Sequence, residues 1–223
     1  MSGKLIVLEG LDGSGKSTQM ECLCRNLSGI GQPFCRIKLP DYDDPSSTLV
    51  QMYLNGEFGR SAGDVNAYAA SLFYAVDRYA SYKRHWEADY LAGRLILADR
   101  YATSNAIHQM GKLPEDEWAG FLDWIDDLEY VKNGIPRPDQ VFYLDMPVEI
   151  SQRLMSARYH GNEVRKDVHE CDVEYLNRCR RTAAYAAAHW GWHVIDCAEN
   201  GQPKSIEEMG KIIFSAVEKE LSD

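Results

Sequence analysis

The chain has 223 residues, which is enough for one sizeable folded domain without the need for a second. Its apolar and charged fractions, 45% and 26%, are those of a globular protein. The formal net charge of −10 argues against broad binding to nucleic acids or anionic membranes, although it allows a local cationic site for phosphates.

The first predicted element is a short buried strand at 4–9, followed by a glycine-rich loop and a helix at 16–28. The stretch 10–17, GLDGSGKS, fits the phosphate-loop pattern G-x-x-x-x-G-K-[ST]. Its glycines allow φ > 0, so that loop N–H groups and the helix N-terminus converge on an anion. Lys16 would reach the β- and γ-phosphates, and the Ser17 hydroxyl would bind Mg²⁺. We therefore expect a nucleoside triphosphate site; the alternative is a glycine-rich turn without a ligand.

Apolar, strand-like runs recur along the chain and alternate with helical stretches. The further strands are predicted at about 34–39, 94–99, 139–145 and 192–197. The further helices are predicted at about 46–55, 64–91, 114–131, 147–158, 170–190 and 204–221. This alternation indicates an α/β fold with a five-stranded parallel sheet and helices on both faces. No linker-like stretch divides the sequence, so we expect a single domain over residues 1–223.

In such a sheet the ligand lies beyond the carboxyl ends of the strands, so the residues that follow each strand are the candidates for the site. Pro40–Tyr42 and Asp145 follow the second and fourth strands, and Asp99 and Arg100 follow the third. A carboxylate at a strand end can hold Mg²⁺ directly or through water. An adjacent guanidinium can bind a phosphate through two hydrogen bonds. The alternative for Asp99 and Arg100 is a surface ion pair, but the nearby phosphate loop favours the functional role.

The long helix predicted near 64–91 carries Tyr74 and Arg78 on one face, one turn apart. An aromatic ring there could stack on a base, and the arginine could bind the edge or phosphate of the same nucleotide. The alternative is an ordinary half-buried tyrosine beside a solvated arginine. A second stripe, which we expect in the core, consists of Leu72, Val76 and Tyr79.

The charged segment from 158 to 170 reads as a mobile loop between two helices. Basic residues cluster around it, namely Arg153, Arg158, Arg165 and Lys166. Such a loop could close over a bound nucleotide and bring an arginine to its γ-phosphate. The alternative is a solvated basic face.

The cysteines and the terminal segments indicate the compartment. The six cysteines show neither a CxxC pair nor metal-type spacing, which favours reduced thiols in a cytoplasmic protein over a metal or redox site. The N-terminus shows no signal-peptide pattern, and no apolar run approaches the roughly 18 residues that a membrane span needs.

Together these motifs resemble the thymidylate kinase family of P-loop nucleoside monophosphate kinases, over about 4–190. The family's phosphate loop is matched by LEGLDGSGKSTQ, its turn after the second strand by LPDY, and its helix with an aromatic residue four before an arginine by FYAVDR. Its DR[YH]-x-x-S-x-x-A-[YF] block is matched by DRYATSNAIHQMG, and its fourth strand by VFYLDMPVE. The resemblance implies a P-loop NTPase fold with a short lid at about 157–170.

The same resemblance implies cofactors and partners. It implies ATP and Mg²⁺ as cofactors, a dTMP-like nucleotide as substrate, and a homodimer. The net charge, the cysteines and the lack of a long apolar run predict a cytoplasmic protein without a nucleic-acid or membrane partner. The long helix, with Trp86 and Tyr90, is a candidate for the dimer interface.

The site residues that the resemblance implies fall into four groups. The residues around the ATP phosphates are Gly10, Asp12, Gly13, Ser14, Gly15, Lys16, Ser17 and Thr18. The residues around the acceptor nucleotide are Asp12, Pro40, Tyr42, Tyr74, Arg78, Arg100, Asn105 and His108. The implied catalytic residues are Lys16, Asp99, Arg100 and Arg165, and the implied metal ligands are Ser17 and Asp99.

The resemblance also implies individual roles on the acceptor side. Asp12 would meet the 3′-hydroxyl of the acceptor, and Arg100 would hold its phosphate. Tyr74 would stack on thymine, Arg78 would bind its carbonyl edge, and Asn105 would read the pyrimidine edge.

The resemblance implies that Arg165 would act from the lid, together with Arg158 or Arg153. Gly13 stands where some family members carry an arginine in the phosphate loop. This replacement is consistent with the bacterial arrangement, in which the lid supplies the catalytic arginine.

The sequence departs from the family pattern at three positions. Leu39 replaces the usual Phe, and Asp41 stands where an arginine or glutamate is common. His108 occupies a position usually held by a Tyr or Phe that screens against a ribose 2′-hydroxyl. These departures bear on the choice of base and sugar more than on the reaction.

The sequence thus predicts a kinase that moves the γ-phosphoryl group of ATP to a pyrimidine deoxynucleoside monophosphate, with dTMP to dTDP as the leading case. One alternative is a related kinase with another acceptor, such as dUMP, a cytidine monophosphate or a free deoxynucleoside. The other is a regulatory P-loop ATPase, against which the absence of an NKxD segment argues. The kinase prediction requires Lys16 and Arg100 to face one cleft.

Overall fold

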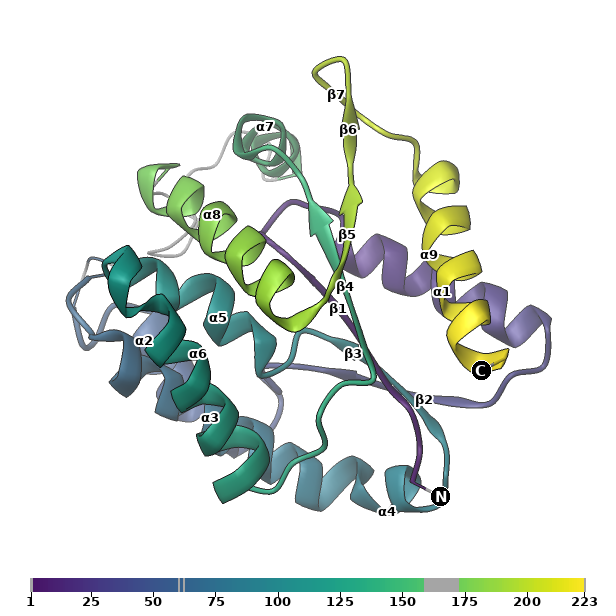
Figure 1. Cartoon of the computed structure of the whole chain (residues 1–223), viewed down its shortest axis with the longest axis horizontal. Helices are drawn as coiled ribbons and strands as arrows, with labels where there is room; N and C mark the ends of the chain where they lie inside the picture. Colours follow the sequence, from purple (N-terminus) through teal and green to yellow (C-terminus); the bar gives the residue numbers. More distant parts are fainter. Residues whose placement is uncertain (1, 60, 62, 159–172, 223) are drawn as a thin grey trace.

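The computed structural model describes residues 2–59, 61, 63–158 and 173–222. Five parallel strands form the central sheet in the order β2-β3-β1-β4-β5 (Figure 1). Their bounds are β1 Leu5–Gly10, β2 Phe34–Lys38, β3 Leu95–Asp99, β4 Gln140–Asp145 and β5 His193–Asp196. All five predicted strands and the parallel sheet are confirmed. Their apolar runs were recognisable because parallel strands are covered on both faces.

Helices fill the connections between the strands. They are α1 Lys16–Gly29, α2 Thr48–Leu54, α3 Ala67–Ser81, α4 Glu87–Leu91, α5 Thr103–His108, α6 Trp118–Asp126, α7 Val148–Arg158, α8 Val173–Trp190 and α9 Ile206–Ser222. Shorter helical turns are η1 Pro45–Ser47, η2 Tyr82–Trp86, η3 Met110–Lys112, η4 Glu115–Glu117 and η5 Asp127–Lys132. Among the helices described, none combines the length and apolar character needed to cross a membrane.

Two predicted helices are interrupted, and two elements were not predicted. The helix expected at 64–91 comprises α3, a π-helical turn η2 and α4, and the one at 114–131 likewise ends in a π-helical turn, η5. The six-residue α5 and the small hairpin of β6 (Ala198–Glu199) and β7 (Gln202–Pro203) are too short to leave a periodic pattern.

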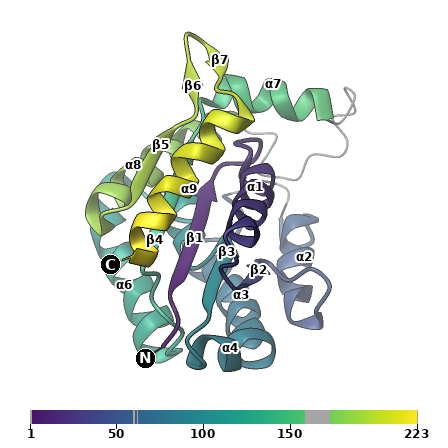
Figure 2. The same ribbon diagram turned by 90° about the vertical axis from the view of Figure 1, so that its right-hand side faces the viewer.

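The two faces of the sheet carry separate hydrophobic layers, as alternation along a strand requires. In β1, Leu5 and Val7 point to the layer built with α3, α5, α6 and α8, whereas Ile6 and Leu8 point to the layer built with α1 and α9. Figure 2 shows α1 and α9 together over the second face. All four strand side chains are buried, so the phosphate loop that follows β1 is attached to a strand in the core of the fold.

The stripe of Leu72, Val76 and Tyr79 on α3 is exposed, and its assignment to the core was wrong. The three residues are 45%, 56% and 44% exposed. The buried side of α3 instead carries small residues and polar groups such as Ala75 and Arg78. Periodicity finds a stripe on a helix but does not state which side of the helix the sheet covers.

Two adjacent isoleucines of α9 test the hydrophobic layer that α1 and α9 build on the second face of the sheet. Ile213 is fully buried and Ile212 is 42% exposed. We expect Ile213→Ala to lower the free energy of unfolding by about 2–5 kcal/mol, because it removes buried methyl groups and leaves a cavity. The matched Ile212→Ala variant should change it by less than about 1 kcal/mol. Urea unfolding followed by circular dichroism measures both, and equal losses would contradict the described packing.

Candidate active site

The phosphate-loop motif forms the turn between β1 and α1, with Gly10 as the last residue of β1 and Lys16 as the first of α1. Gly13 has φ +78°, and a Cβ atom there would lie 2.7 Å from the carbonyl oxygen of Ser151. Only glycine fits both the left-handed conformation and this close approach. The strand–loop–helix context that the motif requires is therefore present.

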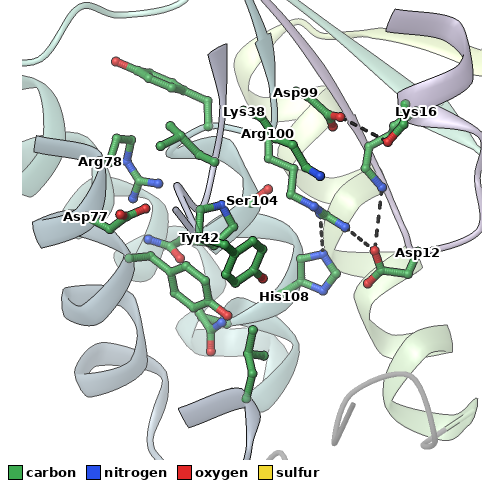
Figure 3. Close-up of a pocket in the computed structure, with 18 of the residues that line it drawn as sticks. Asp12, Lys16, Lys38, Tyr42, Asp77, Arg78, Asp99, Arg100, Ser104 and His108 are labelled. Carbon is green, nitrogen blue, oxygen red and sulfur yellow. Dashed lines mark hydrogen bonds and ion pairs between the residues drawn. The ribbon is translucent and has the colours of Figure 1, made fainter. Parts of the chain in front are cut away.

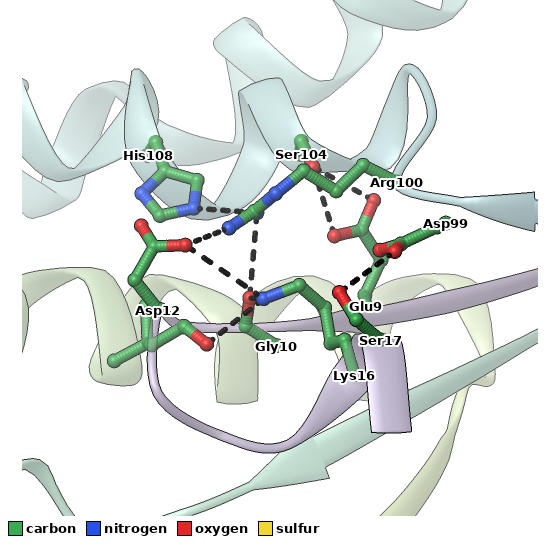
Figure 4. Close-up of polar contacts among 10 residues, drawn as sticks. Glu9, Gly10, Asp12, Lys16, Ser17, Asp99, Arg100, Ser104 and His108 are labelled. Atoms are coloured by element: carbon green, nitrogen blue, oxygen red, sulfur yellow. Dashed lines mark hydrogen bonds and ion pairs between the residues drawn. The ribbon is translucent and has the colours of Figure 1, made fainter. Parts of the chain in front are cut away.

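The Lys16 ammonium lies inside the curve of this loop (Figure 4). It donates hydrogen bonds to the carbonyl oxygens of Gly10 and Leu11, each at 2.9 Å, and lies 3.9 Å from Asp12 Oδ1. Burial, together with the nearby Arg100 guanidinium, lowers the pKa of Lys16 to about 8. The ammonium is thus held at the loop by oxygens that a phosphate could supplement or replace.

Arg100 approaches the same loop from the end of β3. Its Nη2 donates to Asp12 Oδ1 at 2.5 Å, and its Nη1 donates to Gly10 O at 3.4 Å and to His108 Nε2 at 3.2 Å. Arg100 has φ +71°, an unusual conformation for a residue with a Cβ atom. Such strained residues concentrate at functional sites, because the surrounding structure must enforce them.

The charges of this cluster reinforce one another. Burial would raise the pKa of the Asp12 carboxyl, but Arg100 and Lys16 outweigh it and hold that pKa well below its usual range. Burial would lower the pKa of Arg100, but Asp12, Glu9 and Asp99 outweigh it and raise that pKa. Asp12 and Arg100 therefore remain an ion pair at every physiological pH.

Asp99 and Ser17 meet beside this pair. The parallel register places Asp99 opposite Leu8 of β1, and the Ser17 hydroxyl donates to Asp99 Oδ2 at 3.3 Å. A hydroxyl and a carboxylate oxygen are the hard oxygen ligands that Mg²⁺ prefers. The two residues predicted to hold the metal are thus adjacent in the structure.

Glu9 is a site residue that the sequence reasoning missed. It is fully buried in β1, and its carboxylate accepts hydrogen bonds from the backbone N–H of Tyr101 at 3.1 Å, from Thr103 Oγ1 at 2.7 Å and from Ser104 Oγ at 2.8 Å. Burial raises the pKa of Glu9. Its contacts fix the segment just after Arg100. A charged residue inside the apolar run LIVLEG was the signal that could have found it.

A cavity of about 380 Å³ opens from this cluster toward α3 and α5 (Figure 3). The predicted site residues that line it are Asp12, Gly13, Gly15, Lys16, Ser17, Pro40, Tyr42, Tyr74, Arg78, Asp99, Arg100, Asn105 and His108. Three further predicted residues do not line this cavity: Gly10 ends β1, Ser14 lies in the phosphate loop, and Thr18 lies in the first turn of α1. The structure therefore gathers residues from distant parts of the sequence around one space.

The orientation of Arg78 in this cavity is set by a buried partner. Arg78 Nε donates to Glu129 Oε2 at 3.2 Å, and Nη2 donates to Glu129 Oε1 at 2.5 Å. Both side chains are almost fully buried. Glu129 lies in the π-helical turn η5 and was not identified from the sequence. Its planar pairing with Arg78 holds the guanidinium at the cavity wall.

Two buried amides of α5 and its continuation also line the cavity. Asn105 and Gln109 are each 2% exposed, and they are four residues apart on one helical face. Within the part of the chain that the structure describes, Asn105 Nδ2 and Gln109 Oε1 have no hydrogen-bond partner. Such groups are costly unless something else satisfies them, which points to a ligand in the cavity. Gln109 was not predicted as a site residue.

The lid residues are only partly described. Arg165, and with it most of the lid predicted at 157–170, lies outside the described residues, and so does the side chain of Arg158. Arg153 is described, and its Nη2 donates to Gln202 Oε1 at 3.1 Å in the β6–β7 hairpin. The assignment of a lid arginine stays a prediction.

A phosphate loop at the carboxyl end of the central strand of a five-stranded parallel sheet defines a P-loop NTPase fold, and this chain has that fold. The family model described as thymidylate kinase matches residues 8–208. The chain therefore belongs to the thymidylate kinase family, which consists of phosphotransferases.

Individual relatives agree with this assignment. The thymidylate kinase of Mycobacterium tuberculosis is 29% identical over 197 residues, which cover 86% of this chain and 90% of that protein. A probable thymidylate kinase of Thermococcus gammatolerans is 29% identical over 225 residues and covers 98% of both chains. The solved thymidylate kinase from Candida albicans has the same fold, with a TM-score of 0.73 and 23% identity over 98% of this chain and 92% of that chain.

Gly13 provides a test of the loop geometry. In Gly13→Ala, the methyl group would meet the Ser151 carbonyl in a left-handed backbone, at a cost of at least about 1–2 kcal/mol. We expect a melting temperature lower by several degrees and ATP binding weakened at least tenfold. The control is Gly120→Ala in α6, where nothing lies within 4 Å of an added Cβ, and which should be neutral or slightly stabilising. Scanning calorimetry measures the melting temperature of each variant, and isothermal titration measures its ATP binding. Normal ATP binding by Gly13→Ala would contradict the loop assignment.

Proposed function

We propose that this protein transfers the γ-phosphoryl group of ATP to the phosphate of dTMP, giving ADP and dTDP. The observation that supports the proposal best is the meeting of two cations from different strands. Lys16 Nζ and Arg100 Nη1 both donate to the Gly10 carbonyl, and both side chains contact Asp12 Oδ1. Two cations around one carboxylate are suitably placed to bind one chain of phosphates.

The chemistry needs no strong general base. A phosphate oxygen of the acceptor is already ionised near neutral pH and can attack the γ-phosphorus directly. As this bond forms, the bond from the γ-phosphorus to the bridging oxygen breaks, and its electron pair leaves with ADP. Lys16 would stabilise the charge on the donor phosphates, and Arg100 would hold the acceptor phosphate in line. Asp12, which contacts both cations, would accept a hydrogen bond from the acceptor 3′-hydroxyl.

The donor set at Ser17 and Asp99 fits Mg²⁺. Among the described residues, no group of three or more His, Cys, Asp or Glu side chains lies close enough together to hold a metal ion. Mg²⁺ in nucleotide enzymes uses one or two protein ligands together with water and phosphate oxygens, so the adjacent Ser17 hydroxyl and Asp99 carboxylate suffice. Bound there, the ion would neutralise charge on the β- and γ-phosphates.

The acceptor half of the cavity suits a thymine-like base. Arg78 and Asn105 Nδ2 are donors, and Gln109 Oε1 is an acceptor. Thymine presents the complementary set, with two carbonyl oxygens and one N–H on its pairing edge, whereas cytosine has an acceptor at N3. The Tyr74 ring lines the same cavity and would stack on the base.

One alternative differs in the acceptor, and the other is a regulatory ATPase without an acceptor. His108 lines the cavity and accepts a hydrogen bond from Arg100. Its imidazole stands where the family pattern has a Tyr or Phe, so the preference for deoxyribose over ribose must be tested. ADP release should be measured with dTMP, dUMP, dCMP, UMP and thymidine. We expect the highest kcat/KM with dTMP. A preference for thymidine or dCMP would overturn the proposed acceptor, and rapid ATP turnover without any acceptor would favour a regulatory ATPase.

The cysteines support a cytoplasmic location. Cys22, Cys24, Cys35, Cys179 and Cys197, which are the cysteines that the structure describes, are all free thiols. Free thiols are typical of reducing compartments.

Lys16 and Arg100 provide the first mutational test. We expect Lys16→Ala and Arg100→Ala each to lower kcat by at least ~100-fold, the scale of losing one electrostatic donor to a transition state. The matched control is Lys132→Ala, since Lys132 is largely exposed and pairs only with Asp127 among the described residues. Circular dichroism should show that all three variants are folded. Near-normal turnover in either site variant would remove that residue from the mechanism.

The exposed stripe of α3 supports a homodimer as the working assembly. Leu72, Val76 and Tyr79 present a row of apolar side chains on one helix, a feature typical of protein–protein interfaces. Trp86, which the sequence suggested for the interface, is only 1% exposed and belongs to the core of the protomer.

Light scattering after size exclusion tests this assembly. We expect twice the chain mass of 25.3 kDa for the wild type and a single chain mass for Val76→Glu, because a charge in an apolar interface is costly. Ile30→Glu, at a similarly exposed position at the end of α1, should leave the dimer intact. A monomeric wild type would contradict the proposed dimer.

A further inference from the structure

Lys112 joins three elements that surround the acceptor half of the cavity. It ends η3, the turn that continues α5, and its ammonium donates to Tyr53 Oη at 2.7 Å and to the Val65 carbonyl oxygen at 3.0 Å. The same ammonium lies 4.9 Å from the centre of the Tyr53 ring, beside its hydroxyl edge. Tyr53 belongs to α2, and Val65 immediately precedes the N-cap residue of α3.

The environment of Lys112 is unusual for a lysine. It is largely enclosed, and no carboxylate within the described ranges forms an ion pair with it. Burial lowers the pKa of Lys112 to about 8. Within the described residues this ammonium is balanced by a hydroxyl and a carbonyl oxygen, and such an enclosed ammonium lowers stability compared with an exposed one. Simple stability of the fold therefore gives a poor account of this residue.

The contacts of Lys112 lead directly to the predicted base-stacking residue. The Tyr53 ring, which is 3% exposed, meets the Tyr74 ring edge-on, with 6.3 Å between the centroids and an angle of 88°. Val65 lies at the start of α3, the helix that carries Tyr74 and Arg78. The Lys112 ammonium thus fixes both the ring against which Tyr74 packs and the entry of the chain into the helix of Tyr74.

We propose that Lys112 is a positioning residue for the acceptor nucleotide, which acts through Tyr53 and the start of α3 to hold the Tyr74 ring in its stacking position. The inference rests on the proposed function, because Tyr74 is taken as the ring that stacks on the acceptor base. Lys112 itself does not line the cavity and touches no reacting group. Its removal should therefore affect acceptor binding while leaving ATP binding and the chemical step nearly unchanged.

The effect of Lys112 is separated from fold stability by comparing two ligands. We expect Lys112→Met to raise both the Kd and the KM for dTMP about tenfold, with kcat and the Kd for ATP within about twofold of the wild type, as expected for loss of uniform binding. Lys112→Arg keeps both donors and should restore dTMP binding to within about threefold. The matched control, Lys132→Met, replaces an exposed lysine of η5 and should change none of these values.

A double-mutant cycle tests the route through Tyr53. Tyr53→Phe keeps the ring against Tyr74 but removes the hydroxyl, so it should also raise the Kd for dTMP. The variant with both Lys112→Met and Tyr53→Phe should bind dTMP no more weakly than Lys112→Met alone, because Lys112→Met already removes the contact that Tyr53→Phe breaks. Fully additive effects would contradict the proposed route.

The outcomes separate this inference from the proposed function. A wild-type protein that does not phosphorylate dTMP would overturn the proposed function and the inference with it. An active wild type whose Lys112→Met variant loses thermal stability but keeps its dTMP affinity would overturn the inference alone. If Lys112→Met does not fold, an unchanged dTMP affinity in Tyr53→Phe would overturn the inference instead.

Discussion

The carboxylate of Asp12 joins the two halves of the site, because it is the common partner of Lys16 and Arg100. The two cations come from parts of the sequence more than 80 residues apart, and parallel pairing of β1 with β3 places them at the same end of the sheet. Without such a carboxylate, two like charges so close together in a half-buried site would repel each other strongly. The arrangement of donor and acceptor phosphates that we propose depends on this one contact and on the rigid sheet beneath it.

A second level of organisation lies around the acceptor. Glu9 fixes the segment after Arg100, Glu129 orients Arg78, and Lys112 links the elements that carry Tyr53 and Tyr74. Glu9 and Glu129 are fully buried, and all three groups bind neighbours from another part of the chain. The residues predicted to touch substrate therefore have little freedom to reorient, which reduces the entropy lost when a nucleotide binds.

The sequence was sufficient for those features that depend on local pattern. The five strands were recognisable as apolar runs, the loop at 10–17 by its fixed spacing, and Asp99 and Arg100 by their place after a buried strand. Partners such as Glu129 could not be found in this way, because their role depends on tertiary pairing across 51 positions. The outward side of α3 was misassigned for the same reason, since a stripe of Leu72 and Val76 looks alike in a core and on a surface.

Binding of a single molecule in which adenosine and thymidine are joined by five phosphates tests the central claim most directly. If the Lys16 and Arg100 cations bind one phosphate chain, calorimetric titration should show one molecule per chain, bound at least tenfold more tightly than ATP or dTMP alone. Lys16→Ala and Arg100→Ala should each weaken that binding at least tenfold. Binding of two molecules per chain, or full affinity in either variant, would contradict the account.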